Sequence, residues 1–240
     1  MSEYDLLAAW FRVADWTAYD LSKSGGEGIV LKPLGQYPKA ATFIARAASK
    51  SSVSQHRKIA ACLAAWIKQP PPDLLRDLFQ QEAERDRQLP KKDFGRFDTQ
   101  SVVEDIVFSA AFWARNPSTQ AAGFDLLRSV VEKTIGGEYW NTSSYAITTL
   151  LHHQAPGSSE LLKRFHDFAM KANVDHPTNP SLTQEKEFAQ NLAAKNPKTL
   201  RVIESLLDQK VEAATGDDLD ENSRAAIDEL VQCAERFNAP

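Results

Sequence analysis

Three prolines in predicted turns constrain the fold of this chain more than any other sequence feature. Pro117, Pro156 and Pro197 lie about 40 residues apart, and each separates two amphipathic helical patterns. A period of this length, with one tight turn per unit, is typical of stacked helical hairpins in which each unit packs on its neighbours. The turns therefore predict antiparallel helix pairs.

Apolar residues recur every three to four positions on both sides of these turns, as they do on the buried face of a helix. The clearest pair runs from Thr99 to Gly136 and turns at Asn116-Pro117-Ser118. Three further pairs follow the same pattern: Lys39–Lys50 with Val53–Lys68, Tyr145–Asn173 around Ala155-Pro156-Gly157, and Thr183–Gly216 around Asn196-Pro197-Lys198.

Single helices are predicted over Tyr4–Leu21, Asp73–Arg87 and Asn222–Phe237, whereas the glycines and prolines of Ser22–Pro38 predict an extended loop. The total is about eleven helices and no convincing strand pair. We therefore predict an all-α fold, a right-handed stack of antiparallel helix pairs (an α-solenoid). It forms a single domain: residues 1–37 are an N-terminal helix and loop, 38–216 the hairpins, and 217–240 a capping helix.

Composition narrows the class of protein. Of 240 residues, 42% are hydrophobic and 25% charged, as in an ordinary globular domain. No apolar run approaches the roughly 18 residues that cross a bilayer, and the N-terminus is acidic where a signal peptide is basic. We expect a cytoplasmic protein without a membrane partner, with Cys62 and Cys233 as reduced packing residues. No motif predicts a cofactor, a metal site or a catalytic residue.

The period and the Asn-Pro turns at Asn116-Pro117 and Asn196-Pro197 resemble degenerate HEAT or armadillo-type repeats over roughly Pro38 to Gly216. The resemblance implies a curved stack whose concave face binds another macromolecule.

A weaker resemblance concerns the alkylpurine DNA glycosylases built from HEAT-like repeats. Glu138-Tyr139-Trp140-Asn141 is similar to their active-site element of paired tryptophans followed by an aspartate. Asn141 stands where the resemblance implies the catalytic carboxylate, and an amide does not stabilise a developing cation as an anion does. What this resemblance implies is a relative with altered or absent catalysis.

The charge of −4 conceals a polarised chain. Between Gly28 and Pro72 there are seven basic residues and no acidic one, whereas Asp208 to Glu229 contains eight acidic residues and two basic ones. Lys39, Arg46 and Lys50 fall on one helix face. The basic segment is either a solvated face or a binding patch for nucleic acid or an acidic protein; the residues of the patch are Lys39, Arg46, Lys50, Arg57 and Lys58.

The second candidate site is Tyr139-Trp140-Asn141, because Gly136-Gly137 ends the preceding helix and places these aromatic side chains on a turn. An aromatic residue on a turn either anchors a partner or folds back onto the neighbouring repeat. We expect a non-catalytic protein-binding module or adaptor, with an immunity or inhibitor protein, or a subunit of a defence complex, as its context. The alternatives are a nucleic-acid-binding repeat protein and an altered glycosylase relative.

Overall fold

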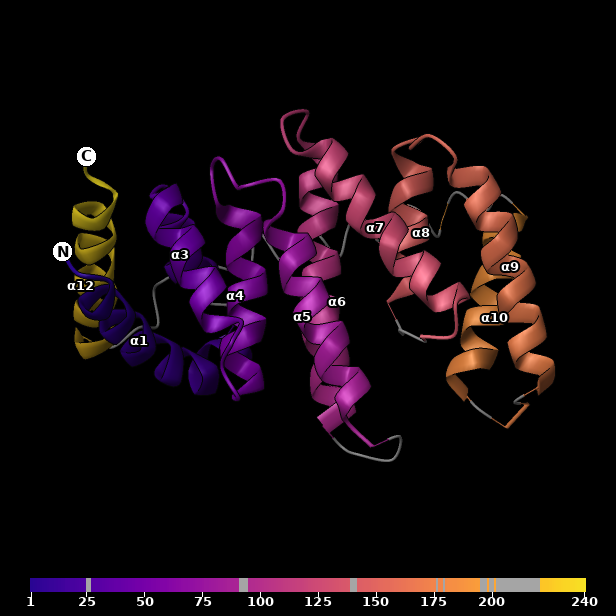
Figure 1. Ribbon diagram of the computed structural model, residues 1–240, viewed down its shortest axis with the longest axis horizontal. Coiled ribbons are helices and arrows are strands. Elements are labelled where there is room, and N and C mark those ends of the chain that lie inside the picture. Colours follow the sequence, from indigo (N-terminus) through magenta and orange to yellow (C-terminus); the bar gives the residue numbers. More distant parts are fainter. Residues whose placement is uncertain are drawn as a thin grey trace. The chain divides into compact units, whose positions relative to one another are not determined.

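The computed structural model describes residues 1–24, 27–90, 95–138, 142–175, 177–178, 180–194, 198, 201 and 221–240. These residues form eleven helices and no strand, which confirms the all-α class (Figure 1). The helices are α1 (Glu3–Ser24), α2 (Glu27–Leu34), α3 (Pro38–Ala48), α4 (Ser54–Trp66), α5 (Leu74–Gln88), α6 (Gly95–Arg115), α7 (Gln120–Ile135), α8 (Ser143–His152), α9 (Ser158–Asp175), α10 (Pro180–Ala193) and α12 (Glu221–Asn238).

The chain forms two compact units, and the boundary between them falls within α6. Unit 1 consists of residues 1–109 and 208–240, and unit 2 of residues 110–207. The predicted single domain is thus described as two units, each with its own buried core. The second helix of the hairpin predicted over Thr183–Gly216 lies mostly outside the described residues.

In unit 1, α3 and α4 form the first predicted hairpin and pack on each other. Both helices are rich in fully buried alanines: Ala40, Ala41, Ala45, Ala48, Ala60, Ala61 and Ala64. A methyl side chain keeps helix backbones close, and larger residues such as Ile44 and Leu63 fill the remaining space. Ala-rich helices therefore pair tightly here.

The extended loop predicted over Ser22–Pro38 is wrong, because α1 continues to Ser24 and α2 occupies Glu27–Leu34. Val30, Leu31 and Leu34 are buried and share one helical face, which packs against α4. Pro33 lies in the last turn of this short helix, where it removes a single N–H donor. Burial of this apolar face outweighs the helix-breaking preference of the local glycine and proline.

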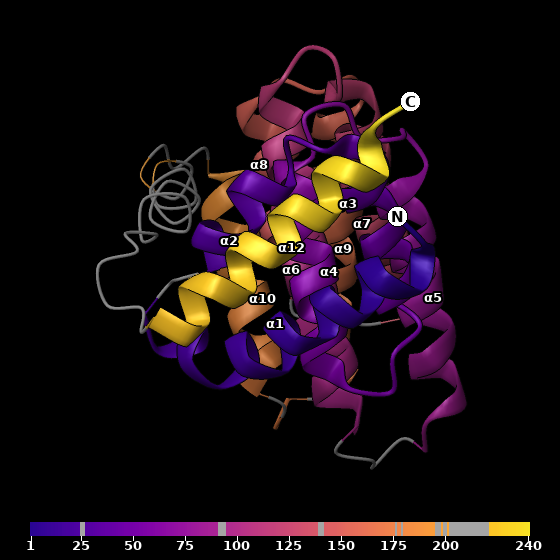
Figure 2. The same ribbon diagram turned by 90° about the vertical axis from the view of Figure 1, so that its left-hand side faces the viewer.

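The C-terminal helix α12 packs on α1, α2 and α3, so the two ends of the chain belong to the same unit (Figure 2). Its buried face consists of Ser223, Ile227, Leu230 and Ala234. Phe237 stacks on Phe43 of α3 with ring centroids 5.4 Å apart. The sequence predicted a capping helix after the last hairpin; the structure places the cap on the first helices instead.

Asn238 supplies a helix cap that α3 lacks locally. The residue before α3 is Tyr37, whose side chain makes no capping hydrogen bond. The backbone N–H of Lys39 donates instead to Oδ1 of Asn238, at 2.9 Å and across 199 residues of sequence. One of the unpaired donors of the first helical turn is thereby satisfied by a residue near the other end of the chain.

In unit 2, α7 packs on α8, and α9 packs on α10 and α8. The prediction of a turn at Asn116-Pro117-Ser118 is confirmed, because α6 ends at Arg115 and α7 begins at Gln120. The side chain of Asn116 accepts hydrogen bonds from the backbone N–H and the hydroxyl of Ser118, at 3.1 and 2.9 Å. A closed polar turn of this kind fixes where α7 starts.

Gly123 allows the backbones of α6 and α7 to touch. A Cβ atom added at this position would lie 2.7 Å from the carbonyl oxygen of Ala110 and 2.9 Å from the nitrogen of Ala114. Both atoms belong to the backbone and cannot rotate away, so any side chain here separates the helices.

We therefore expect Gly123→Ala to lower the free energy of unfolding by about 1–3 kcal/mol, although alanine is intrinsically the better helix former. The measurement is chemical denaturation. Gly136→Ala is the matched control, because Gly136 has a φ of −75° and a Cβ there meets nothing closer than 3.4 Å. Equal stability of Gly123→Ala and wild type would contradict the tight contact.

The Asn238 cap generates a second expectation. Asn238→Ala removes the acceptor of the Lys39 N–H and should cost about 1 kcal/mol, measured by thermal or chemical unfolding. Asn238→Asp keeps an acceptor oxygen and places a negative charge at a helix N-terminus, so it should retain most of the stability. A loss of the same size in both variants would rule out capping as the cause.

Candidate interaction surfaces

A glycine turn ends α7 in a defined geometry. The N–H of Glu138 donates to the carbonyl of Lys133 at 2.9 Å, and the N–H of Gly137 donates to the carbonyl of Thr134 at 3.0 Å. This pair of hydrogen bonds is the Schellman motif, which requires a left-handed residue at the position of Gly137. Gly137 has a φ of +98°, so the sequence Gly136-Gly137 explains both the end of the helix and the direction in which the chain leaves it.

Next to this turn, α9 is tied to α7 by an ion pair. The guanidinium of Arg164 donates to both carboxylate oxygens of Glu132, at 2.6 and 2.5 Å. The hydrogen bonds and the charge of Glu132 raise the pKa of Arg164 above its usual range. Both side chains are well exposed, so the pair orients α9 more than it stabilises the fold.

A hollow of about 530 Å³ lies between the end of α7 and one face of α9. Ile135, Gly136 and Gly137 form its α7 side. The α9 side combines apolar and charged residues at helical spacing, namely Arg164, Asp167, Phe168, Lys171, Ala172 and Asp175. Ile135, Phe168 and Ala172 are half-buried, and the side chains of Lys171 and Asp175 are exposed. The hollow therefore offers apolar contact surrounded by charge.

Tyr139, Trp140 and Asn141, the predicted partner-binding residues, lie outside the described residues, so the resemblance to the glycosylase element is not tested. One described segment ends at Glu138, directly after Gly137, and the next begins at Thr142. The hollow between α7 and α9 was not predicted from the sequence. The signal was present: the charges of α9 recur at positions 164, 167, 171 and 175.

One residue of the predicted basic patch, Arg57, lies inside the protein and not on its surface. Arg57 is only 4% exposed, and its Nε lies 2.8 Å from Oε1 of Glu82, which is 2% exposed. The same guanidinium donates to the carbonyls of Ser51 and Ser52 at 3.0 and 2.9 Å. Arg57 thus holds the turn between α3 and α4 from inside and is not available to a partner.

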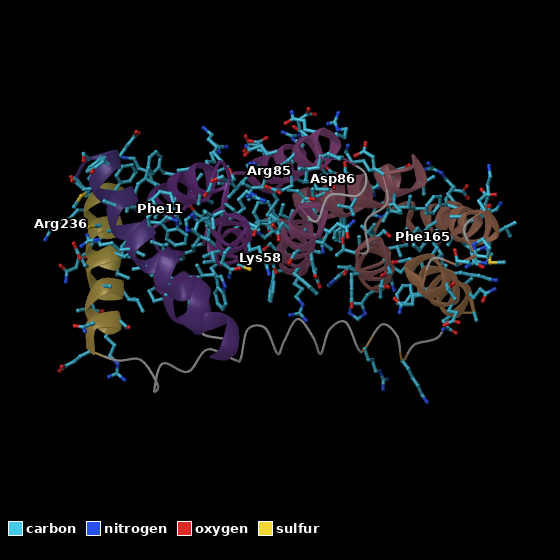
Figure 3. All side chains as sticks on the ribbon, turned by 90° about the horizontal axis from the view of Figure 1, so that it is seen from below. Phe11, Lys58, Arg85, Asp86, Phe165 and Arg236 are labelled. Carbon is cyan, nitrogen blue, oxygen red and sulfur yellow. The ribbon has the colours of Figure 1, made fainter. Side chains whose placement is uncertain are left out.

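Other basic residues of the patch have internal partners as well. Nη2 of Arg46 lies 3.1 Å from Asp73, Nζ of Lys58 lies 3.9 Å from Asp105, and the Lys39 ammonium lies over the Phe237 ring at 5.4 Å. Lys39, Arg46 and Lys50 are exposed, as predicted for one helical face. Within this segment, Arg46, Arg57 and Lys58 thus each lie near a carboxylate (Figure 3 labels Lys58).

The buried Arg57–Glu82 pair has a third member, since Nε of Arg85 lies 3.6 Å from the same Glu82 oxygen. Removal from water lowers the pKa of Arg57 and raises the pKa of Glu82, and the opposite charges counteract both shifts. The guanidinium groups of Arg57 and Arg85 stay protonated in proteins, so both favour the charged form of Glu82 against the effect of its burial. This cluster joins α4 to α5 and is structural.

The described part of the chain lacks two features that would indicate a metal site or a membrane span. There, no group of three or more His, Cys, Asp and Glu side chains is placed to hold a metal ion. None of the described helices combines the length and the apolar character that a membrane span requires.

Comparisons with protein-family models, curated proteins and solved structures gave no match for this chain. The resemblance to HEAT or armadillo repeats therefore stays a prediction.

The buried pair yields a stability prediction. Glu82→Leu leaves Arg57 buried without its counter-ion and should cost about 3–5 kcal/mol in the free energy of unfolding. The double variant Arg57→Met with Glu82→Leu removes both charges and should be clearly more stable than Glu82→Leu alone. Chemical denaturation of the two variants measures the difference; a double variant that is no more stable than the single one would contradict a charge effect.

Proposed function

We propose that this protein is a non-catalytic α-solenoid module that binds a protein partner through the hollow between α7 and α9. The helical hairpins of unit 2 and the period of about 40 residues support a stacked arrangement of repeats. The observation that carries the proposal is the hollow itself, with its half-buried apolar floor of Ile135, Phe168 and Ala172 and its rim of charged side chains. An apolar centre within a polar rim is the usual anatomy of a protein–protein contact.

The charges of the rim favour a protein over a nucleic acid. Asp167 and Asp175 lie beside Lys171 on α9, and Arg164 is paired with Glu132. A phosphate backbone binds to surfaces of uncompensated positive charge, and the carboxylates of this rim repel it. A peptide or helix with both signs of charge meets no such penalty.

The Schellman turn supports the same function, because it holds one wall of the hollow in a fixed position. Three backbone hydrogen bonds to the last turn of α7 define Gly136, Gly137 and Glu138, and Lys133 lies 3.3 Å from the Glu138 carboxylate. A preformed wall lowers the entropy lost on binding. In this proposal Tyr139 and Trp140, which follow directly in the sequence, supply aromatic anchors for the partner.

The test is affinity purification of the tagged intact protein from its native cells, with two matched variants. Lys171→Glu reverses a charge on the rim of the hollow, and we expect at least a tenfold loss of the retained partner, about 1.4 kcal/mol. Lys50→Glu makes the same change of charge on an exposed residue of unit 1 and should leave retention unchanged.

The outcomes separate the alternatives. A partner retained equally by wild type and Lys171→Glu would remove the hollow as the binding surface. Co-purified nucleic acid that is lost in Lys50→Glu and kept in Lys171→Glu would favour nucleic-acid binding by the basic segment instead.

A further inference from the structure

Helix α12 covers part of unit 1 with a narrow apolar face. Of its 18 residues, all within the described part of the chain, four are buried: Ser223, Ile227, Leu230 and Ala234. Ile227 and Leu230 are the large apolar side chains among them, and Val231 and Phe237 are half-buried. In α4, by contrast, seven of 13 residues are buried. Apolar burial therefore holds α12 less strongly than its length suggests.

The chain gives α12 no short connection to the helices that it contacts. Residues 110–207, which form unit 2, lie in the sequence between the first part of unit 1 and α12. Helix α12 nevertheless packs on α1, α2 and α3 (Figure 2). Its place in unit 1 depends on these non-covalent contacts, whereas α3 and α4 are joined by a short turn.

The C-terminal end of α12 makes directional contacts with the start of α3. The Phe237 ring stacks on Phe43 with ring centroids 5.4 Å apart, and the Lys39 ammonium lies 5.4 Å from the centre of the same Phe237 ring. The neighbouring Asn238 accepts the hydrogen bond of the Lys39 N–H at 2.9 Å. We call these four residues the α12–α3 contact.

The ion pair between α12 and α1 adds little to this contact. Nη2 of Arg12 lies 2.7 Å from Oε1 of Glu229, but the two side chains are 60% and 51% exposed. Exposed ion pairs contribute little net stability, because water screens the charges. The docking of α12 therefore depends more on the α12–α3 contact than on this pair.

We propose that α12 is a reversible cover, which opens as one unit from α1, α2 and α3 while the other helices of unit 1 stay folded. The opening breaks the α12–α3 contact and exposes the faces of the three helices on which α12 packs. Segments that bury little apolar surface open at a lower free energy than the whole fold. This inference concerns unit 1 and goes beyond the proposed function, which concerns unit 2.

Native-state hydrogen exchange of the intact protein tests the opening, under conditions in which the exchange rate reports the opening equilibrium. The amides in the middle of α12 and the amide of Lys39 should exchange at least tenfold faster than the slowest amides of α4. The amide of Lys39 belongs to the first group because its acceptor, Asn238, leaves with α12.

Two mild variants distinguish opening of α12 from unfolding of the whole unit. Asn238→Ala removes an interaction of the closed form, so the α12 amides should exchange about fivefold faster. The slowest α4 amides change by the same factor at most, since global unfolding breaks this interaction as well. Ile59→Val shortens a buried side chain of α4 that stays packed when α12 opens, so it should accelerate the slowest α4 amides and leave the α12 amides unchanged.

Arg12→Ala is the matched control on the other side of α12. It removes the exposed pair with Glu229 and should change the exchange of the α12 amides less than twofold.

Equal protection of the α12 amides and the slowest α4 amides in the wild-type protein would overturn the proposal. An Ile59→Val variant in which both sets of amides accelerate together would overturn it as well. Either result means that α12 leaves its place only when unit 1 unfolds.

Discussion

Close contact between helix backbones, made possible by residues with little or no side chain, governs the packing of both units. In unit 1 the fully buried alanines of α3 and α4 allow these helices to pair, and Gly35 sits where a Cβ would lie 2.1 Å from the carbonyl of Trp66. In unit 2, Gly123 does the same for α6 and α7. The position of α7 determines where its terminal glycine turn lies, and hence one wall of the hollow. A small residue at a helix contact therefore controls the geometry of a surface a full helix away.

Basic and acidic side chains lie close to one another in the folded chain, although they are separated along the sequence. The basic segment finds its counter-ions in the next elements, on Glu82, Asp73 and Asp105. Desolvation makes the buried member of this set costly to disrupt, while the exposed members contribute little to stability. The charges of α9 combine two roles: Arg164 pairs with Glu132 of α7, whereas Asp167, Lys171 and Asp175 line the hollow beside its apolar residues. This contrast is the reason to look for binding at α9.

Local sequence patterns predicted most of the helices, but they did not predict the contacts between residues that are far apart in the sequence. The turn at Asn116-Pro117-Ser118 and the spacing of apolar residues define α6 to α9 because these signals act within a few residues. Another local signal lies at the start of α1, where Ser2 and Asp5 exchange hydrogen bonds across three residues. Helix α2 was missed because its stability comes from burial against α4. The burial of Arg57 was missed because it depends on Glu82, which follows one helix later in the sequence.

The docking of α12 on the first helices has a consequence for the order of events during synthesis. Lys39 and Asn238 are separated by 199 positions, so the acceptor that completes the first turn of α3 is made long after its donor. At about 5–20 residues per second, the N-terminal helices are synthesised roughly 10–40 s before α12 is complete. Through that interval α12 does not yet cover the faces of α1 and α3 on which it packs. Unit 1 is therefore complete only after all of unit 2 has been made.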